Sequence, residues 1–393
     1  MKIYEIGTGY TPIPARMGAA TEIVVEELTR SLIKLGYDAE IVDIKTNDRA
    51  ECERPIKEVS VPSVFTKKDV SLGIMHKLKR VAYSVSLAKK LSSIIKNADE
   101  APLVFHFHNQ YNLFFFLKLT PKRLRKRVKI IYTVHSYIWH GEWDKIKDTV
   151  SKRYFQEIYC VKNADRVFVL NDQTARTFEQ HLGVLSERIT LIDNGVNTEL
   201  YAPLKEKERS LRREANLLDG KRVFISVGSV CERKNQLGAL KLLAPLMKRD
   251  PDIVYLFAGG IIDRDYQLSI FEYAIEQGLK DRVQYFGELC PGADLGRFYG
   301  IADAMLFPSK AEGFSLVIIE AMSAGVPVII PDTLSFKLKD ECLRYSDEES
   351  FENIIEASIL DESERENISE RVRAHVKDRY GWDRIASDYI SAL

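Results

Sequence analysis

Cysteine is scarce and scattered in this chain, which argues against a disulfide framework or a cysteine-based metal site. The sequence has five cysteines in 393 residues, without paired spacing or a histidine pattern typical of zinc ligands. It has no uninterrupted apolar run of about 18 residues, as a membrane-spanning helix would need. It begins with the strand-like residues 2–6 instead of a basic-then-apolar leader. We therefore expect reduced thiols and a cytoplasmic protein.

Net charge is also absent, but the charge is unevenly distributed. Residues 1–200 contain 31 Lys and Arg against 24 Asp and Glu, and the densest basic run is 122–127. This run could be a solvated surface of the protein. Its positive electrostatic field would also attract an anionic acceptor or acidic lipid headgroups. One expectation is peripheral contact with an acidic membrane, at its inner face, through residues 118–129. Nucleic acid is not expected, because no binding motif accompanies the basic residues.

The length and composition favour two domains. A chain of 393 residues exceeds what one core usually fills, and 45% hydrophobic with 29% charged residues is ordinary enzyme composition. The pattern restarts after Asn194 and Gly195, and Pro203 follows. We expect one domain at 1–200, a second at 201–380, and a terminal helix at 381–393 that packs back on the first. A ligand cleft is expected between the domains.

Short apolar runs alternate with longer helical patterns along the whole chain, which predicts an α/β fold with parallel sheets covered by helices. Strands are expected near 2–6, 38–44, 102–107, 129–134, 165–170, 189–193, 222–227, 253–258, 282–286, 303–307 and 327–330. Helices are expected near 18–36, 75–97, 148–163, 172–182, 234–249, 266–278, 294–301, 315–324, 363–380 and 382–392.

Residues 312–322 join two carboxylates by a glycine turn and an apolar helical segment. Gly313 falls in a loop, and Ser315 is well placed to begin a helix. Free amides at a helix start attract phosphate. Glu320 lies among apolar residues, where an unpaired buried carboxylate would cost several kcal/mol, roughly, unless a partner such as a ribose diol supplied hydrogen bonds. The alternative for a lone glutamate is a solvated charge near a helix end.

A series of segments resembles the retaining glycosyltransferases of the GT-B class that form glycosyltransferase family four. The matching segments are 164–171, 193–203, 283–289, 295–304, 308–309, 312–322 and 325–329. Their order, spacing and residue types agree, and the resemblance covers nearly the whole chain. It implies two Rossmann-like, doubly wound parallel-sheet domains facing a central cleft, with the acceptor on the first and a nucleotide diphosphate sugar on the second.

The resemblance implies roles for residues of the second domain. Glu312 would lie beside the donor sugar, with Gly313 in the turn, and Glu320 would bind the ribose. Backbone amides of Phe314, Ser315 and Leu316 would hold sugar hydroxyls and diphosphate, and Lys234 would supply a cation for the leaving diphosphate. Ser229 replaces an arginine that is usual in the family, and we expect Arg233 to supply the second charge. The alternative is an exposed arginine at a helix start.

Residues 12–21 resemble the family's glycine-rich loop facing the diphosphate, where small residues permit close backbone approach. Gly18 matches, whereas Ala19 stands where a second glycine is common, so donor or acceptor would sit differently. Arg16 in this loop is a candidate acceptor contact. The alternative is a loop that only caps the next helix.

Histidines follow two strands expected in the first domain. His135 ends the strand near 129–134 and matches a family residue that reaches the donor sugar. The carboxyl ends of parallel strands are where ligands bind in such sheets. His108 and Asn109 follow the strand near 102–107 and are candidate acceptor contacts.

Three other patterns are set aside. Asp263 and Asp265 are expected in a polar loop, and no metal is predicted. Gly7 and Gly9 lack the third glycine of a dinucleotide motif. Residues 114–116 are three phenylalanines, which predict a buried helical or strand segment or an exposed membrane-contact patch.

The resemblance implies a metal-independent transfer, with retention of configuration, from a UDP-sugar or GDP-sugar to an acceptor, with no cofactor. The expected acceptor is a glycan, glycolipid or other cell-envelope saccharide precursor. Two alternatives stay open: a nucleotide-sugar epimerase of GT-B architecture, and a catalytically weak scaffold that binds nucleotide sugar.

Overall fold

The computed structural model describes residues 1–15, 20–47, 49, 55–62, 74–98, 102–334 and 338–393. The chain divides into two compact units. Unit 1 comprises Met1–Asn194 and Trp382–Leu393, and unit 2 comprises Gly195–Gly381. None of the described helices has a segment long and apolar enough to cross a membrane.

Unit 1 is built on a seven-stranded sheet in the order β3-β2-β1-β4-β5-β6-β7, in which each neighbouring pair is parallel. The strands are β1 Lys2–Ile6, β2 Asp38–Ile44, β3 Ile56–Val59, β4 Leu103–Phe107, β5 Val128–Val134, β6 Arg166–Val169 and β7 Ile189–Leu191. The strand order reverses beside β1, between β1 and β4, which makes the sheet doubly wound.

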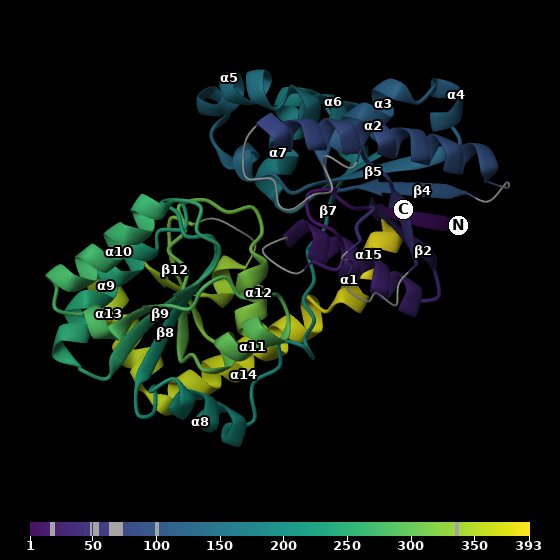
Figure 1. The fold of residues 1–393 in the computed structure, drawn as a ribbon. Coiled ribbons are helices and arrows are strands. Elements are labelled where there is room, and N and C mark those ends of the chain that lie inside the picture. Colours follow the sequence, from purple (N-terminus) through teal and green to yellow (C-terminus); the bar gives the residue numbers. More distant parts are fainter. Residues whose placement is uncertain (16–19, 48, 50–54, 63–73, 99–101, 335–337) are drawn as a thin grey trace. The chain divides into compact units, whose positions relative to one another are not determined.

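Helices cover both faces of this sheet (Figure 1), with α1 packed against α15, and α3 packed against both α2 and α6. The α-helices of unit 1 are α1 Ala20–Lys34, α2 Ile74–Asn97, α3 Gln110–Leu119, α4 Lys122–Arg125, α5 Trp143–Arg153, α6 Phe155–Asn163, α7 Asp172–Leu182 and α15 Trp382–Ser391. Short 3-10 helices span η2 Tyr137–His140 and η3 Ser186–Arg188. Lys34 of α1 forms an ion pair with Asp383 of α15.

Unit 2 is built on a six-stranded parallel sheet in the order β10-β9-β8-β11-β12-β13. The strands are β8 Arg222–Val227, β9 Ile253–Ala258, β10 Val283–Tyr285, β11 Ala304–Leu306, β12 Val328–Pro331 and β13 Leu343–Tyr345. The helices are α8 Glu206–Ala215, α9 Gln236–Arg249, α10 Arg264–Glu276, η4 Lys280–Arg282, α11 Ala293–Gly300, α12 Leu316–Ser323, η5 Lys339–Glu341, α13 Glu348–Ile354, the π-helical η6 Ile355–Leu360, and α14 Glu362–Arg379.

The unit 2 sheet has a core on each face, because strand side chains alternate. Val223 and Ile225 of β8 pack with α11, α12 and α14, whereas Phe224 packs in the other core with α9, α10 and α13. β9 is buried along its whole length. Such continuous burial is typical of parallel strands covered on both faces.

The structure confirms the expected α/β class with two parallel sheets. It also corrects local expectations. Residues 148–163 do not form one helix: α5 and α6 meet at Tyr154, whose backbone φ of −122° is not helical. The phenylalanines at 114–116 belong to a helix, α3, in which Phe116 is buried. The elements β3, β13 and α13 were not predicted from the sequence.

Candidate functional site

The candidate site of unit 2 lies where two adjacent parallel strands end. β8 is followed by the loop 228–235 and β11 by the segment 307–315, and the two strands pair with each other. Their carboxyl ends therefore reach the same edge of the sheet, the usual ligand edge of such folds. Lys310 N donates to Arg233 O and Asn235 Nδ2 donates to Pro308 O, so the two segments are also tied together.

Glu312 is the centre of this cluster and is 8% exposed. Its Oε1 lies 2.7 Å from Nη1 of Arg233 and 2.7 Å from Nζ of Lys234. Ser309 Oγ donates to the same oxygen over 2.6 Å. The structure thus brings together three residues predicted from the sequence, Arg233, Lys234 and Glu312, and adds Ser309.

Lys234 is the more deeply placed cation, with a side chain 13% exposed against 32% for Arg233. Burial lowers the pKa of Lys234, and Glu312 opposes this change by favouring the charged form. Arg233 and Lys234 carry two positive charges against the one negative charge of Glu312. Glu232 of the same loop is paired with Lys310, so a net positive charge is left. This positive charge is in place before any ligand binds, so it would attract an anionic group of a ligand.

Ser229 comes directly after Gly228 at the end of β8, and its carbonyl accepts from Gln236 Nε2 at 3.0 Å. Its position therefore offers backbone and a short hydroxyl where the family usually has a guanidinium. Arg233, from the opposite end of the same loop, brings a guanidinium to Glu312. The geometry agrees with the expectation that Arg233 compensates for Ser229, which stays a prediction.

The start of α12 is close by in sequence. Gly313 and Phe314 follow Glu312, Ser315 is the N-cap residue, and the helix begins at Leu316. Ser315 makes no side-chain cap hydrogen bond, and Phe314 packs against the hydrophobic core. First-turn amides that no cap side chain satisfies are suited to an anion.

Glu320 lies on α12 and is 5% exposed. Tyr299 donates its hydroxyl to Oε2 of Glu320 over 2.9 Å. Burial raises the pKa of Glu320 to about 7, although hydrogen bonds from Tyr299 and Tyr201 oppose the increase. Glu320 was predicted from the sequence, but these tyrosines were not. Tyr299 lies within the matching segment 295–304, and this is the sequence signal that could have indicated it.

In unit 1, the predicted residues Arg16, Gly18 and Ala19 lie outside the described residues. The part of the loop that precedes them is anchored by two buried carboxylates: Asp43 Oδ2 accepts from the amide of Ile13 at 2.8 Å, and Glu22 accepts from the hydroxyl of Thr8.

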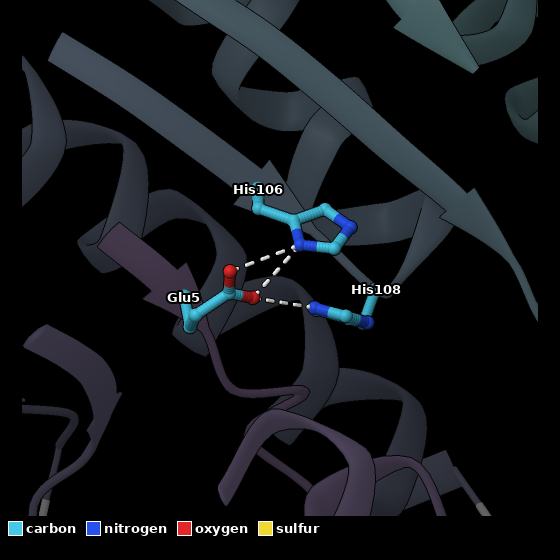
Figure 2. Close-up of side chains that lie close together, drawn as sticks. All are labelled: Glu5, His106 and His108. Atoms are coloured by element: carbon cyan, nitrogen blue, oxygen red, sulfur yellow. Dashed lines mark hydrogen bonds and ion pairs between the residues drawn. The ribbon is translucent and has the colours of Figure 1, made fainter. Parts of the chain in front are cut away.

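The predicted histidines of unit 1 belong to a hydrogen-bonded chain that is buried at Glu5 and His108 and partly buried at His135. Glu5 Oε2 is 2.9 Å from Nε2 of His108, and Nδ1 of His108 is 3.0 Å from Nε2 of His135. Figure 2 shows His106 and His108 on the same side of Glu5, with both imidazoles directed at its carboxylate. Asn109 donates to the hydroxyl of Tyr10 at 3.0 Å, and its Oδ1 caps α3.

The charge state of this chain follows from its burial. Burial opposes ionisation of Glu5, but His106 and His108 outweigh it and hold the pKa of Glu5 at about 2. Burial, with His106 adding to it, lowers the pKa of His108 to about 4. Burial also lowers the pKa of His135. Both nitrogens of His108 have protein partners, which does not favour its predicted contact with an acceptor. Glu5 was not predicted from the sequence.

Glu5, His106 and His108 place one potential ligand atom each within 4.8 Å of one another. A carboxylate with two imidazoles is a donor set that zinc or iron accepts. Each imidazole nitrogen of His106 and His108 already has a hydrogen-bond partner, which is Glu5, Thr133 or His135. The expectation of no metal stays a prediction.

The fold is similar over the whole chain to solved structures of the GT-B class. One of them is HepE of Anabaena, solved in complex with UDP and glucose. The comparison with this chain gives a TM-score of 0.73 and a sequence identity of 18%, and it covers 100% of both chains. At this sequence identity the similarity concerns the fold alone. The shared fold has two successive doubly wound α/β units, each with a parallel sheet.

Two family models match the sequence. The model described as Glycosyl transferases group 1 matches residues 207–375, and the model described as Glycosyltransferase Family 4 matches residues 21–200. Together they extend over most of both units, and the protein belongs to the family-4 type of GT-B glycosyltransferases.

The chain spans about half the length of several named relatives that it matches. The D-inositol 3-phosphate glycosyltransferase of Corynebacterium aurimucosum is 27% identical over 51% of this chain and 49% of the relative. The UDP-Gal:alpha-D-GlcNAc-diphosphoundecaprenol alpha-1,3-galactosyltransferase of Escherichia coli is 28% identical over 51% of each protein.

Proposed function

We propose that the protein transfers a sugar from a nucleotide diphosphate sugar to a saccharide or lipid-linked acceptor, with the donor held by unit 2 and the acceptor by unit 1. The observation that carries this proposal is the convergence of Arg233 and Lys234 on Glu312, just before the start of α12. UDP-sugars are the first donors to test, because HepE was solved with UDP and glucose. GDP-sugars are the alternative, and no further cofactor is proposed.

The chemistry explains why cations and amides are needed at this edge. Breaking the bond between a sugar and its diphosphate builds negative charge on the leaving group, and preorganised donors there lower the barrier. Lys234 and Arg233 would supply positive charge, and the amides of Phe314, Ser315 and Leu316 would supply hydrogen bonds. In this proposal the two cations stabilise the charge on the leaving diphosphate, as a metal ion does in metal-dependent enzymes.

Glu312 has two roles in the proposal. Without donor it holds both cations in place, which keeps them from pairing elsewhere. With donor bound it would accept hydrogen bonds from sugar hydroxyls. We propose transfer with retention, in which the leaving diphosphate helps to deprotonate the acceptor on the same face of the sugar.

Glu320 would bind the ribose. Tyr299 occupies Oε2, and a ribose diol would add hydroxyl donors to the buried carboxylate. An ionised carboxylate accepts hydrogen bonds only, so it matches a diol better than a neutral carboxyl does.

We propose an anionic acceptor, because unit 1 holds a cation against a tyrosine that is hydrogen-bonded to Asn109, a predicted acceptor contact. The guanidinium of Arg80 lies 4.7 Å from the ring centroid of Tyr10 and 4.1 Å from that of Tyr111, which orients a cation on two aromatic faces. Tyr10 is also tied to the predicted Asn109. The names of the two relatives above contain inositol 3-phosphate and a diphosphoundecaprenol sugar, and both of these carry phosphate.

A location at the cytoplasmic face of a membrane would suit a lipid-linked acceptor. Lys122, Arg123, Lys126 and Arg127 are all exposed around the short helix α4, whose Leu124 is buried. We propose peripheral contact of this segment with acidic lipid. The support is the exposed positive charge, which acidic headgroups attract.

A panel of UDP- and GDP-sugars, with and without candidate acceptors, tests the proposal by mass detection of released nucleotide and of new glycosides. We expect slow hydrolysis of one donor alone and faster nucleotide release with the right acceptor. Interconversion of donor sugars without acceptor would instead establish an epimerase. Tight nucleotide binding without transfer or hydrolysis of any donor would establish a binding scaffold.

A further inference from the structure

The buried chain Glu5–His108–His135 has a direction that hydrogen-bond chemistry fixes. An ionised carboxylate accepts hydrogen bonds and cannot donate. The contact of 2.9 Å between Glu5 Oε2 and His108 Nε2 therefore requires the proton on Nε2 of His108. A neutral imidazole carries one N–H, so Nδ1 of His108 is bare and accepts. The next contact, of 3.0 Å, then requires Nε2 of His135 to be the donor.

We propose that Glu5, acting through His108, is a positioning residue that fixes His135 as the Nε2–H tautomer, with Nδ1 unprotonated. Among the described residues, Nδ1 of His135 has no hydrogen-bond partner. His135 follows β5 directly, at the carboxyl edge of the sheet, and is only partly buried. It would therefore offer a neutral hydrogen-bond acceptor to a sugar hydroxyl, and not a cation or a donor.

The surroundings of Glu5 keep the carboxylate in the form that this chain requires. His106 is a second imidazole partner, 2.8 Å from Oε2, and its Nε2 is held at 2.7 Å by the hydroxyl of Thr133. From α15, the ring of Tyr389 stacks on His106 with centroids 5.0 Å apart. Glu5 itself is fully buried. A carboxylate that water cannot reach, with imidazoles on it, is held in one geometry and one charge state.

The assignment of His135 to the sugar rests on the proposed function, but the assignment of its tautomer does not. Orientation of an imidazole by a buried carboxylate is a known way to fix which nitrogen is bare. Here an extra imidazole transmits the effect. Each of the three residues follows or belongs to a different strand, β1, β4 or β5, which are neighbours in the sheet.

Long-range proton–nitrogen spectra of the protein labelled with 15N-histidine test the inference without any substrate. Substitutions of His108 and His135 by glutamine identify their signals. We expect both residues to carry the proton on Nε2 in the wild-type protein. A proton on Nδ1 of either residue overturns the inference, even if sugar transfer is found. The wild-type spectrum decides this point whether or not a variant folds.

Glu5→Gln is the functional arm, and Glu157→Gln is its matched control. Glu157 is a second buried glutamate of unit 1, and its partners are Tyr132 and Trp139 instead of histidines. We expect Glu5→Gln to change the His108 and His135 signals and to lower kcat about tenfold or more, with nucleotide affinity unchanged. Glu157→Gln should leave those signals unchanged. Unchanged histidine signals in folded Glu5→Gln would overturn the role of Glu5. If the signals change but the protein transfers no sugar, the role of Glu5 is supported and only the proposed function is refuted.

A metal at Glu5, His106 and His108 predicts the opposite tautomer. An ion on Nε2 of His108 would leave the proton on Nδ1, which would donate to His135 and move the proton of His135 to Nδ1. Elemental analysis of the purified protein and spectra before and after dialysis against a chelator distinguish the two cases. One equivalent of metal that is lost in Glu5→Gln would overturn the inference.

Discussion

Arg233 and Glu312 are joined by a contact of 2.7 Å between Nη1 and Oε1, across two loops that follow adjacent strands. The guanidinium also donates to the carbonyl of Ala311 at 3.1 Å. This second contact fixes the orientation of the side chain as well as its position. Arg233 is thus held beside the proposed phosphate site, although Ser229 stands where the family usually places an arginine.

Arg233→Gln should lower kcat about a hundredfold, since it removes one preorganised cation from the proposed leaving group. Donor hydrolysis or transfer under saturating donor measures the effect. Arg249→Gln is the matched control, because Arg249 pairs with Glu352 on the surface of unit 2. Equal activity of the two variants would show that Arg233 is an ordinary surface arginine.

Donor affinity should increase with pH through about 7, because the pKa of Glu320 is raised to about 7. Below this pKa the carboxyl is protonated and is a poorer acceptor for ribose hydroxyls; above it the carboxylate is ionised. Calorimetric titration of the nucleotide sugar between pH 5.5 and pH 8.5 measures the change. In Glu320→Gln the affinity should be weaker and should lose this transition. In Tyr299→Phe the midpoint should move upward, because one hydrogen bond to the carboxylate is lost.

The same shift predicts a pH dependence of stability. Glu320 has a higher pKa folded than unfolded, so its contribution is fully present below the unfolded pKa of about 4.5 and is lost as pH increases through about 7. The loss would amount to about 3 kcal/mol if unit 2 unfolds in one step. Urea unfolding of wild type and Glu320→Gln at pH 5 and pH 8 measures it. A loss of equal size in both proteins would contradict the assignment to Glu320.

Asp303→Asn should destabilise unit 2 by about 3 kcal/mol, because it removes the negative charge that two partly buried arginines share. Asp303 lies 2.7 Å from Arg209 and 3.3 Å from Arg213, and it also accepts from the amide of Val223 at 2.7 Å. Its pKa is lowered, chiefly by Arg213 against the opposing effect of burial, so the stabilisation is lost as pH falls. Asp294→Asn, on the exposed surface, is the control in urea unfolding and should cost little.

Binding to vesicles that contain acidic lipid should weaken about tenfold or more when Lys122, Arg123 and Lys126 are replaced by glutamate, and it should fall with added salt. Cosedimentation measures the bound fraction. Reversal of Lys145 and Lys147, which are exposed on α5 beside acidic partners, is the control. Binding that does not respond to salt or to either set would refute the membrane proposal.

Much of the fold could be predicted because buried parallel strands are continuous apolar runs. The residues 253–258 are one such run and form β9 as expected. Short edge strands have weak patterns, so β3 and β13 were missed. Residues 114–116 were ambiguous, since three consecutive phenylalanines fit a strand or a buried helix equally well. The cap at Asn109, which accepts from the amides of Tyr111 and Asn112, decides in favour of a helix.

The candidate site was predictable where its residues are close in sequence or follow a family pattern. Arg233, Lys234 and Glu312 belong to two short motifs, and the structure brings them together. Glu5 could not be predicted, because its partner His108 is 103 positions away and one glutamate in a strand has no distinctive pattern. Only the pairing of β1 with β4 places Glu5 beside the histidines.

A crystal structure of the protein with bound UDP would show directly where the nucleotide binds. We expect a diphosphate within hydrogen-bond distance of Lys234 and of backbone amides at the start of α12, with the ribose hydroxyls on Glu320. A nucleotide bound anywhere else, or a ribose that does not contact Glu320, would contradict the proposed donor site.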